Sequence, residues 1–219
     1  MCQSPGLDYI VKKIAFTQRL IENETYPEMR DALDVRWAEF CAELGVLPVL
    51  LPSAYDFRVY FKEFDISGVV FTGGNDLYSV SQSSLSLKRD AFEKALLYFA
   101  LENSIPVLGI CRGMQLIAEY FGATLRNVEG HTAARHELIL TTESSYFIWP
   151  GSQEAVNSYH TYIVAGLPEC LRVAALSKNG SVEALEHICL PVVAQMWHPE
   201  REAPFKSHDL ALFKRLFNL

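Results

Sequence analysis

Short apolar runs alternate with longer amphipathic segments through the first half of the chain. Runs of about four to eight apolar residues fit strands covered on both faces, and an apolar residue every three or four positions fits a helix with one buried face. The pattern predicts strands at 13–18, 46–51, 68–71 and 105–110, and helices at 26–44, 54–64, 87–102 and 114–121. It therefore predicts an α/β fold with a doubly wound, mostly parallel sheet, whose sites lie beyond the carboxyl ends of the strands.

The segment 26–44 carries the start and stop signals of a helix. Thr25 is a candidate N-cap, Pro27 lies near the first helical position and Gly45 follows the end. Its predicted apolar face consists of Met29, Leu33, Trp37, Phe40, Cys41 and Leu44.

A polar, serine-rich stretch at 78–86 follows the third strand and is predicted to be a mobile loop at the mouth of a site. In the helix after it, Lys88, Arg89 and Asp90 are predicted to form a solvated first turn. The predicted inward positions of that helix are Ala91, Ala95, Leu96 and Phe99.

The second half of the chain departs from this rhythm. The elements predicted there are a flexible polar segment at 129–136, a strand at 136–142, a hairpin of strands 171–177 and 182–186 with a type I′ turn at Asn179-Gly180, a strand at 192–197 and a final helix capped by Ser207.

The polar segment 129–136 contains His131, Arg135 and His136. We expect no metal there, because no carboxylate or cysteine stands at ligand spacing. Anion binding by His131, Arg135 or Arg126 is favoured over metal binding, and a solvated loop is the simplest interpretation.

Cys111 lies where a buried strand meets an amphipathic helix. The pattern Gly109-x-Cys111-x-Gly113 has the spacing of a nucleophile elbow, in which glycines remove the Cβ atoms that would clash at a strained turn. The first turn of the helix would favour a thiolate, and the Arg112 N–H would face an oxyanion. The alternative is a buried cysteine that packs as a small apolar residue.

A base for this nucleophile is found in the segment Trp197-His198-Pro199-Glu200. Pro199 favours an extended His198, so the side chains at 198 and 200 project to one side and the Glu200 carboxylate can orient the imidazole. A single histidine is more often structural, but the elbow and the His-Pro-Glu segment together predict a triad of Cys111, His198 and Glu200.

With these motifs the chain resembles the class I glutamine amidotransferases and, within them, the γ-glutamyl hydrolase branch of cysteine peptidases. The resemblance rests on the elbow, on the His-Pro-Glu segment, on Thr72-Gly73-Gly74 and on Asn157-Ser158-Tyr159-His160. It implies a three-layer, flavodoxin-like fold and cleavage of a γ-glutamyl amide, without a metal or another cofactor.

The resemblance also implies roles for individual residues. The Gly73-Gly74 turn supplies the second oxyanion donor, opposite the N–H of Arg112, and Gln115 contacts the glutamyl end of the substrate. The segment from Asn157 through Ser158 and Tyr159 to His160 frames the glutamyl group, largely through its backbone. This chain has Tyr162 where the γ-glutamyl hydrolases often have glutamine, which affects the expected leaving-group contacts and not the triad.

Composition narrows the class of protein. With 219 residues and 50% hydrophobic content, the chain is expected to form one domain over 1–219. A net charge of −7, spread along the chain, argues against nucleic acid or an anionic membrane as the main partner and leaves a small molecule. The sequence leaves open whether the protein forms a homo-oligomer.

Cysteine usage and the N-terminus indicate a compartment. Five cysteines without close pairs indicate neither a disulfide framework nor a Cys-x-x-Cys metal site. The N-terminus has no pattern of a targeting segment, and no apolar run approaches the ~18 residues of a membrane span. We therefore expect a cytoplasmic protein.

The stretch from Phe16 to Tyr26 resembles a bacterial group of γ-glutamyl-CDP-amidate hydrolases, which release cytidine diphosphoramidate for the modification of capsular polysaccharide. Arg19 is then placed to meet an anionic leaving group, as are Arg112 and Arg135; the simplest alternative for Arg19 is a surface ion pair with Glu22 or Glu24. Three other functions stay open: a γ-glutamyl-aminobutyrate-type hydrolase, a glutaminase subunit that supplies ammonia to a synthase, and, least favoured because the triad is complete, a non-catalytic binding protein.

Overall fold

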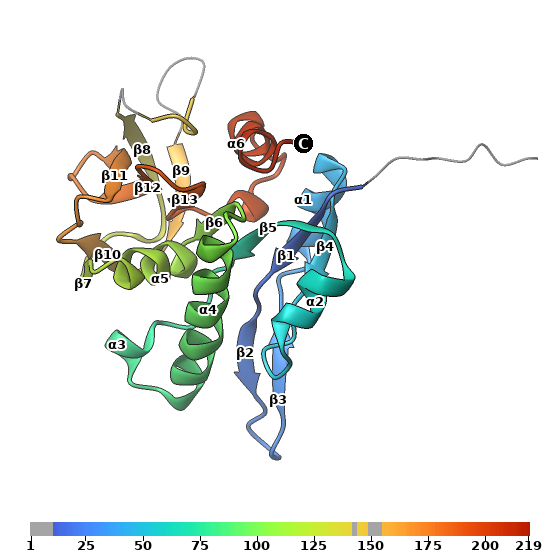
Figure 1. Ribbon diagram of the computed structural model, residues 1–219. Coiled ribbons are helices and arrows are strands. Elements are labelled where there is room, and N and C mark those ends of the chain that lie inside the picture. The colour runs from blue at the N-terminus through green and yellow to red at the C-terminus, as the bar shows by residue number, and fades with distance from the viewer. Residues whose placement is uncertain (1–10, 142–143, 149–154) are drawn as a thin grey trace, which may run out of the picture.

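The computed structural model describes residues 11–141, 144–148 and 155–219. Its centre is a sheet of nine strands among these residues, with helices on both faces (Figure 1). The strands run in the order β4 (Leu47–Leu50), β1 (Lys13–Phe16), β5 (Ile66–Phe71), β6 (Val107–Ile110), β13 (Val192–Gln195), β12 (Val182–His187), β11 (Leu171–Ser177), β8 (Thr132–Leu140) and β9 (Ala155–Tyr159).

The first five strands of this order are parallel, and the remaining four pair antiparallel. In the parallel part, β6 lies between β5 and β13. Because parallel strands end at the same edge of a sheet, the residues that follow β5, β6 and β13 meet there. These are the Thr72 turn, Cys111 and His198, so the topology assembles one site from three distant segments.

Two apolar layers enclose the sheet. On one face, Trp37 and Phe40 of α1 (Arg36–Leu44) pack with Phe213 and Phe217 of α6 (Ser207–Phe217). The other face is covered by α2 (Phe57–Glu63), α4 (Ser84–Glu102) and α5 (Arg112–Tyr120), whose apolar residues form a second core cluster. The structure thus confirms the predicted α/β class.

The helix predicted at 26–44 is wrong in its first half. The chain forms a hairpin of β2 (Arg19–Glu22) and β3 (Met29–Ala32), and α1 begins only at Arg36. Asn23 accounts for the turn, since its side chain accepts hydrogen bonds from the backbone and hydroxyl of Thr25. Thr25 is therefore a turn residue and not an N-cap, and Met29 is exposed.

The stretch 78–86 is not an open loop. It contains the short helix α3 (Tyr78–Ser81) and the first residues of α4, whose N-cap Ser83 accepts a hydrogen bond from the N–H of Ser86. Arg89 and Asp90 of α4 are buried and Ala91 and Ala95 are exposed, contrary to prediction. Leu96 and Phe99 of α4 pack in the core as predicted.

Further corrections concern the second half of the chain. Strand β8 begins at Thr132, so the polar segment is not flexible beyond that residue, and Thr142, its predicted end, lies outside the described residues. The turn between β11 and β12 spans three residues, and only Gly180 among them has a positive φ. It is therefore a bulged turn and not the predicted type I′ turn. Ser207 is the first residue of α6, after the N-cap Lys206.

A second small sheet pairs β7 (Thr124–Asn127) with β10 (Tyr162–Ala165). Within the described ranges, no helix has both the length and the apolar character needed to cross a membrane. The four cysteines among these residues, Cys41, Cys111, Cys170 and Cys189, are free, and Cys2 lies outside them.

Candidate active site

Cys111 occupies a strained position between β6 and α5. Its backbone has φ of 52° and ψ of −104°, a conformation that residues with a side chain rarely adopt. The N–H of Cys111 donates to the Gln195 carbonyl of β13 at 2.8 Å, which holds the turn against the sheet. A Cβ on Gly109 would come within 2.6 Å of Ile117, and one on Gly113 would collide with the Phe71 carbonyl. Both glycines are therefore needed for the close packing of the elbow.

His198 and Glu200 follow β13 at the same edge of the sheet. His198 is extended, with φ of −106° and ψ of 98°, and Pro199 begins a 3₁₀ turn, η1 (Pro199–Arg201). His198 Nδ1 lies 2.7 Å from Glu200 Oε1, and the His198 side chain is also hydrogen-bonded to Cys111. The structure thus brings together the three residues that the sequence singles out, all of them buried.

The electrostatics of His198 favour its charged form. Burial alone lowers the pKa of His198, but the negative Cys111 and Glu200 on either side outweigh it and raise the pKa to about 9. At neutral pH the His198 ring is therefore protonated, and it can act as a proton donor beside the Cys111 sulfur.

A pH profile tests this pairing. Because the pKa of His198 is raised from 6.5 to about 9, we expect activity to persist through neutral pH and to fall above pH 9, where the imidazolium loses its proton. Removing the Glu200 charge in Glu200→Gln should move this alkaline limb down by roughly one to three pH units. The measurement is kcat/KM against pH for both proteins, and coincident alkaline limbs would contradict the pairing.

The Asn157 side chain binds the backbone of His198, a role that the sequence did not reveal. Its side-chain amide donates to the His198 carbonyl at 2.8 Å and accepts from the His198 N–H at 2.9 Å. It also donates to Glu202 Oε1 at 2.8 Å. The Asn157 side chain therefore fixes the backbone of the base.

The turn after β5 lies directly against the His198 ring. A Cβ on Gly73 would come within 2.6 Å of that ring, and the Arg19 guanidinium lies over Gly74. Gly74 has a φ of 83°, which residues with a side chain rarely adopt. Asn75 links this turn to the β2–β3 hairpin through two hydrogen bonds of 3.1 Å with the Leu20 backbone.

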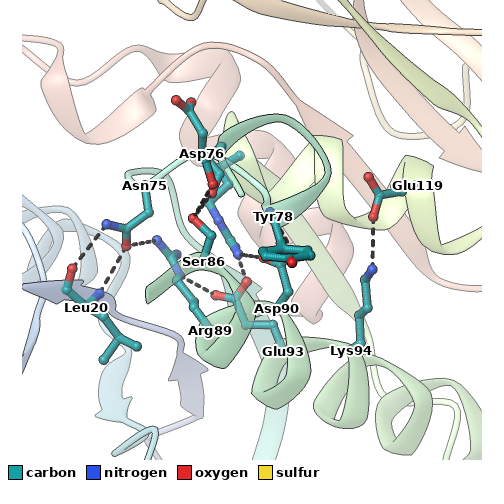
Figure 2. A network of polar contacts seen from close by, with 12 residues as sticks. Leu20, Asn75, Asp76, Tyr78, Ser86, Arg89, Asp90, Glu93, Lys94 and Glu119 are labelled. Carbon is teal, nitrogen blue, oxygen red and sulfur yellow. Dashed lines mark hydrogen bonds and ion pairs between the residues drawn. The ribbon is translucent and has the colours of Figure 1, made fainter. Parts of the chain in front are cut away.

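Arg89 binds the carbonyls of the same turn. Its guanidinium donates to the carbonyls of Thr72 at 2.8 Å, Gly73 at 3.1 Å and Gly74 at 2.7 Å. It also donates to Asn75 Oδ1 at 3.3 Å (Figure 2). Burial lowers the pKa of Arg89 to about 10, which still leaves it charged at neutral pH. Because Arg89 binds these three carbonyls, the peptide groups of the turn are held in one orientation.

Glu93 links the turn after β5 to the helix that follows Cys111 through ion pairs. It accepts from Arg89 Nε at 3.0 Å and pairs with the Arg112 guanidinium, which also pairs with Asp90. All four side chains are buried, which corrects the expected solvated turn at Arg89 and Asp90. Two arginines balance two carboxylates, so the network carries no net charge. The network occupies both terminal nitrogens of Arg112 and leaves its Nε without a hydrogen-bond partner. Contact of Arg112 with an anionic leaving group stays a prediction.

Comparison with known proteins agrees with this geometry. The family model of peptidase C26 matches residues 14–200, from β1 to Glu200 of the triad segment. The chain belongs to the peptidase C26 family. This makes it a hydrolase.

Individual members and solved structures are similar over nearly the whole chain. The gamma-glutamyl-CDP-amidate hydrolase of Campylobacter jejuni is 36% identical over 94% of this chain and 98% of its own length. A structure of a GMP synthase subunit from Thermoplasma acidophilum covers 95% of this chain and 93% of its own, with a TM-score of 0.73 and 22% identity. A glutamine amidotransferase from Thermotoga maritima covers 94% and 84%, with a TM-score of 0.66 and 18% identity. At these identities the two structures support the fold.

Two cavities flank the Cys111–His198 pair of this peptidase C26 member. One, of about 220 Å³, is referred to as the acyl cavity. The other, of about 260 Å³, is referred to as the hairpin cavity because residues of β2 and β3 line it. The acyl cavity is lined by Gly74, Asn75, Asp76, Cys111, Arg112, Gln115, Tyr159, His160 and Thr161. The hairpin cavity is lined by Arg19, Ile21, Ala32, Leu33, Asp34, Trp37, Thr72, Gly73, His198, Glu200 and Arg201.

The expected glutamyl contacts lie partly in the acyl cavity. Gln115 lines it and donates to the Tyr162 carbonyl at 2.9 Å, a bond that does not depend on the side chain at 162. Tyr159 and His160 line it too, whereas Asn157 supports His198 and Ser158 donates to the His131 carbonyl at 2.5 Å. Only the second half of the segment 157–160 therefore borders this cavity.

Of the basic residues expected near a leaving group, some line the hairpin cavity and others lie away from it. Arg19 lines the hairpin cavity together with Arg201, whose guanidinium lies 4.6 Å from the centre of the Tyr159 ring. Arg135 lies elsewhere, bound to Glu202 at 2.9 Å and to the Ala155 carbonyl at 2.6 Å. Sequence reasoning missed Arg201, although it directly follows the triad segment.

Proposed function

We propose that the protein hydrolyses a γ-glutamyl amide through a thioester on Cys111. The thiolate attacks the γ-carbonyl carbon, and the carbonyl electrons move to oxygen to give a tetrahedral oxyanion. As the C–N bond breaks, His198 gives its proton to the departing nitrogen. Water, deprotonated by His198, then attacks the thioester, and glutamate leaves as Cys111 regains its negative charge.

The supporting residues have distinct roles in this proposal. The N–H groups of Gly74 and Arg112 donate to the oxyanion, and each such donor is worth about 2.7–4 kcal/mol of barrier. Glu200 holds the tautomer and orientation of His198. The glutamyl group occupies the acyl cavity beside Gln115, Tyr159 and His160.

For the leaving group, we propose a nucleoside diphosphoramidate, so that the substrate is γ-glutamyl-CDP-amidate and the product is cytidine diphosphoramidate for the modification of capsular polysaccharide. One observation carries this choice. The hairpin cavity lies on the far side of His198 and Gly73 from the acyl cavity and holds two arginines, Arg19 and Arg201. Guanidinium groups suit phosphate oxygens, and the name of the Campylobacter jejuni relative supports the same substrate.

The test compares three substrates. The purified protein is incubated separately with γ-glutamyl-CDP-amidate, γ-glutamyl-aminobutyrate and glutamine, and glutamate release is followed. We expect the highest kcat/KM with the nucleotide substrate. A preference for either of the others would overturn the nucleotide assignment, and glutamine hydrolysis that requires a second protein would identify a synthase subunit instead.

Arg19 provides a residue-level prediction. Loss of its contact with a phosphate oxygen in Arg19→Ala should lower kcat/KM for γ-glutamyl-CDP-amidate by about 10- to 100-fold, the range for a hydrogen bond to a charged group. For a γ-glutamyl anilide, whose leaving group is uncharged, kcat/KM should fall by less than about threefold in the same variant.

The matched control is Arg30→Ala. Arg30 is exposed on the same hairpin, binds Glu28 and does not line the hairpin cavity. Equal losses for both substrates in Arg19→Ala would show a general effect on the site and contradict the assigned contact.

A further inference from the structure

Three histidines and a glutamate form a cluster next to the acyl cavity, which His160 also lines. His131 directly precedes β8, His136 lies on β8, His160 follows β9 and Glu183 lies on β12. One nitrogen or oxygen atom from each residue lies within 4.8 Å of those from the other three. His131, His160 and Glu183 are only 2%, 4% and 1% exposed. The proposed mechanism transfers no proton through any of these four side chains.

The cluster contains buried polar atoms that lack hydrogen bonds. Glu183 Oε1 and His136 Nε2 are both buried and have no hydrogen-bond partner. Among the described residues, Glu183 lies 3.4 Å from His131 and 3.7 Å from His160. A buried polar atom without a hydrogen-bond partner is costly, so these two atoms point to a missing ligand.

We propose that His131, His136, His160 and Glu183 bind one divalent transition-metal ion, with Zn²⁺ as the preferred ion. Imidazole and carboxylate are common ligands of Zn²⁺, whereas Mg²⁺ and Ca²⁺ prefer oxygen ligands alone. A bound cation would neutralise Glu183 and satisfy His136 Nε2 at the same time.

The distances match such a site. The ligand atoms of a tetrahedral Zn²⁺, each about 2.1 Å from the metal, lie roughly 3.4 Å apart. His131 Nδ1 is 3.4 Å from His160 Nε2 and 3.4 Å from Glu183 Oε1, and His160 Nε2 is 3.7 Å from Glu183 Oε2. The two histidine nitrogens therefore stand at the required separation, and each has one oxygen of the Glu183 carboxylate at a similar distance.

Outer contacts orient the histidines. His160 Nδ1 lies 3.2 Å from the Tyr162 carbonyl, so it carries the proton and leaves Nε2 free for a metal. His131 Nε2 lies 2.9 Å from the Asn179 side-chain nitrogen, a contact that fixes the position of the ring. A cavity of about 400 Å³, lined by His131 and His136 among others, gives an ion access from solvent.

A metal at this cluster would affect the proposed active site by fixing the strands and the histidine that border it. It would join β8, β9 and β12 and fix His160, which lines the acyl cavity. The sequence argued against a metal because no carboxylate or cysteine stands at ligand spacing from His131 and His136. Glu183 comes from a distant strand, and the folding of the antiparallel half of the sheet supplies the missing ligand.

Metal binding is tested directly in the full-length protein with Cys111→Ala, which removes the thiolate as a competing zinc ligand. Protein stripped with a chelator is titrated with Zn²⁺, bound metal is measured by elemental analysis, and Co²⁺ serves as a spectroscopic probe of tetrahedral coordination. We expect about one ion per chain and, at 100 times Kd, a rise in Tm on the order of 5–10 °C.

Matched variants locate the ion. Glu183→Gln should abolish binding, whereas Glu137→Gln should retain it, because Glu137 lines the same cavity but pairs with Lys178 at the surface. His136→Asn removes a nitrogen without a hydrogen bond, so it should fold and yet bind Zn²⁺ at least about 10-fold more weakly. If Glu183→Gln does not fold, the zinc affinity of His136→Asn decides whether the cluster is the binding site. Absence of zinc binding and of a Tm rise, or equal binding by His136→Asn and Glu137→Gln, would overturn the proposal.

Discussion

Replacing Cys111 with alanine is expected to lower kcat/KM for the γ-glutamyl substrate by at least about 10⁴-fold, the scale seen when a nucleophile is removed from a triad. The thiolate is the atom that forms the thioester, and His198 alone cannot activate water at the same position. Stability should change little, since Cys111 is 7% exposed and its loss removes one small side chain. The measurement is glutamate release together with the Tm of each protein.

Cys170→Ala is the matched control for Cys111→Ala. Cys170 is a free, half-buried cysteine that packs against the core and lines neither cavity at the site. The Cys170→Ala protein should retain full activity. Residual activity of more than about 1% in Cys111→Ala, with the fold intact, would contradict a covalent mechanism at this residue.

Arg89→Lys is expected to lower kcat by about 10²- to 10³-fold, with KM changed only a few-fold. A lysine keeps the charge beside Glu93 but cannot donate to the carbonyls of Thr72, Gly73 and Gly74 at once. The turn would then lose the orientation of its N–H group, and the loss of one oxyanion donor has this size. The measurement is the separate determination of kcat and KM.

Lys94→Ala is the matched control on the same helix. Lys94 pairs with Glu119 at 2.9 Å near the surface, so its removal should cost less than about 1 kcal/mol and leave kcat unchanged. A folded Arg89→Lys protein with wild-type kcat would show that the turn holds its conformation without the guanidinium. Loss of activity together with loss of the folded state would show a purely structural role.

The elbow and the His-Pro-Glu segment could be predicted because their geometry is local. Gly109 and Gly113 around Cys111 mark a turn that few other residues allow, and Pro199 restricts His198 on its own. The alternation of apolar runs with amphipathic segments predicts a mostly parallel sheet, although not the order of its strands. That His198 and Glu200 face Cys111 requires only that β6 and β13 be neighbours, as they are.

The remaining parts of the site depend on contacts between distant segments. Arg89 looks like a surface residue at the start of a helix, and its burial becomes visible only when Glu93 and Arg112 meet it in space. The first half of the helix predicted over 26–44 failed because an apolar period was extended back to Met29, which lies in a hairpin. Asn157, chosen for a resemblance, supports the base through an amide geometry that no sequence pattern encodes.

A covalent trapping experiment tests the central claim most directly. A glutamine analogue with a diazoketone in place of the amide places an electrophile where the γ-carbonyl would lie. After incubation with the wild-type protein, peptide mass spectrometry is predicted to find one adduct per chain, on Cys111, and none in His198→Ala under the same conditions. Modification of Cys41, Cys170 or Cys189 at the same rate, or no adduct on Cys111, would contradict the account.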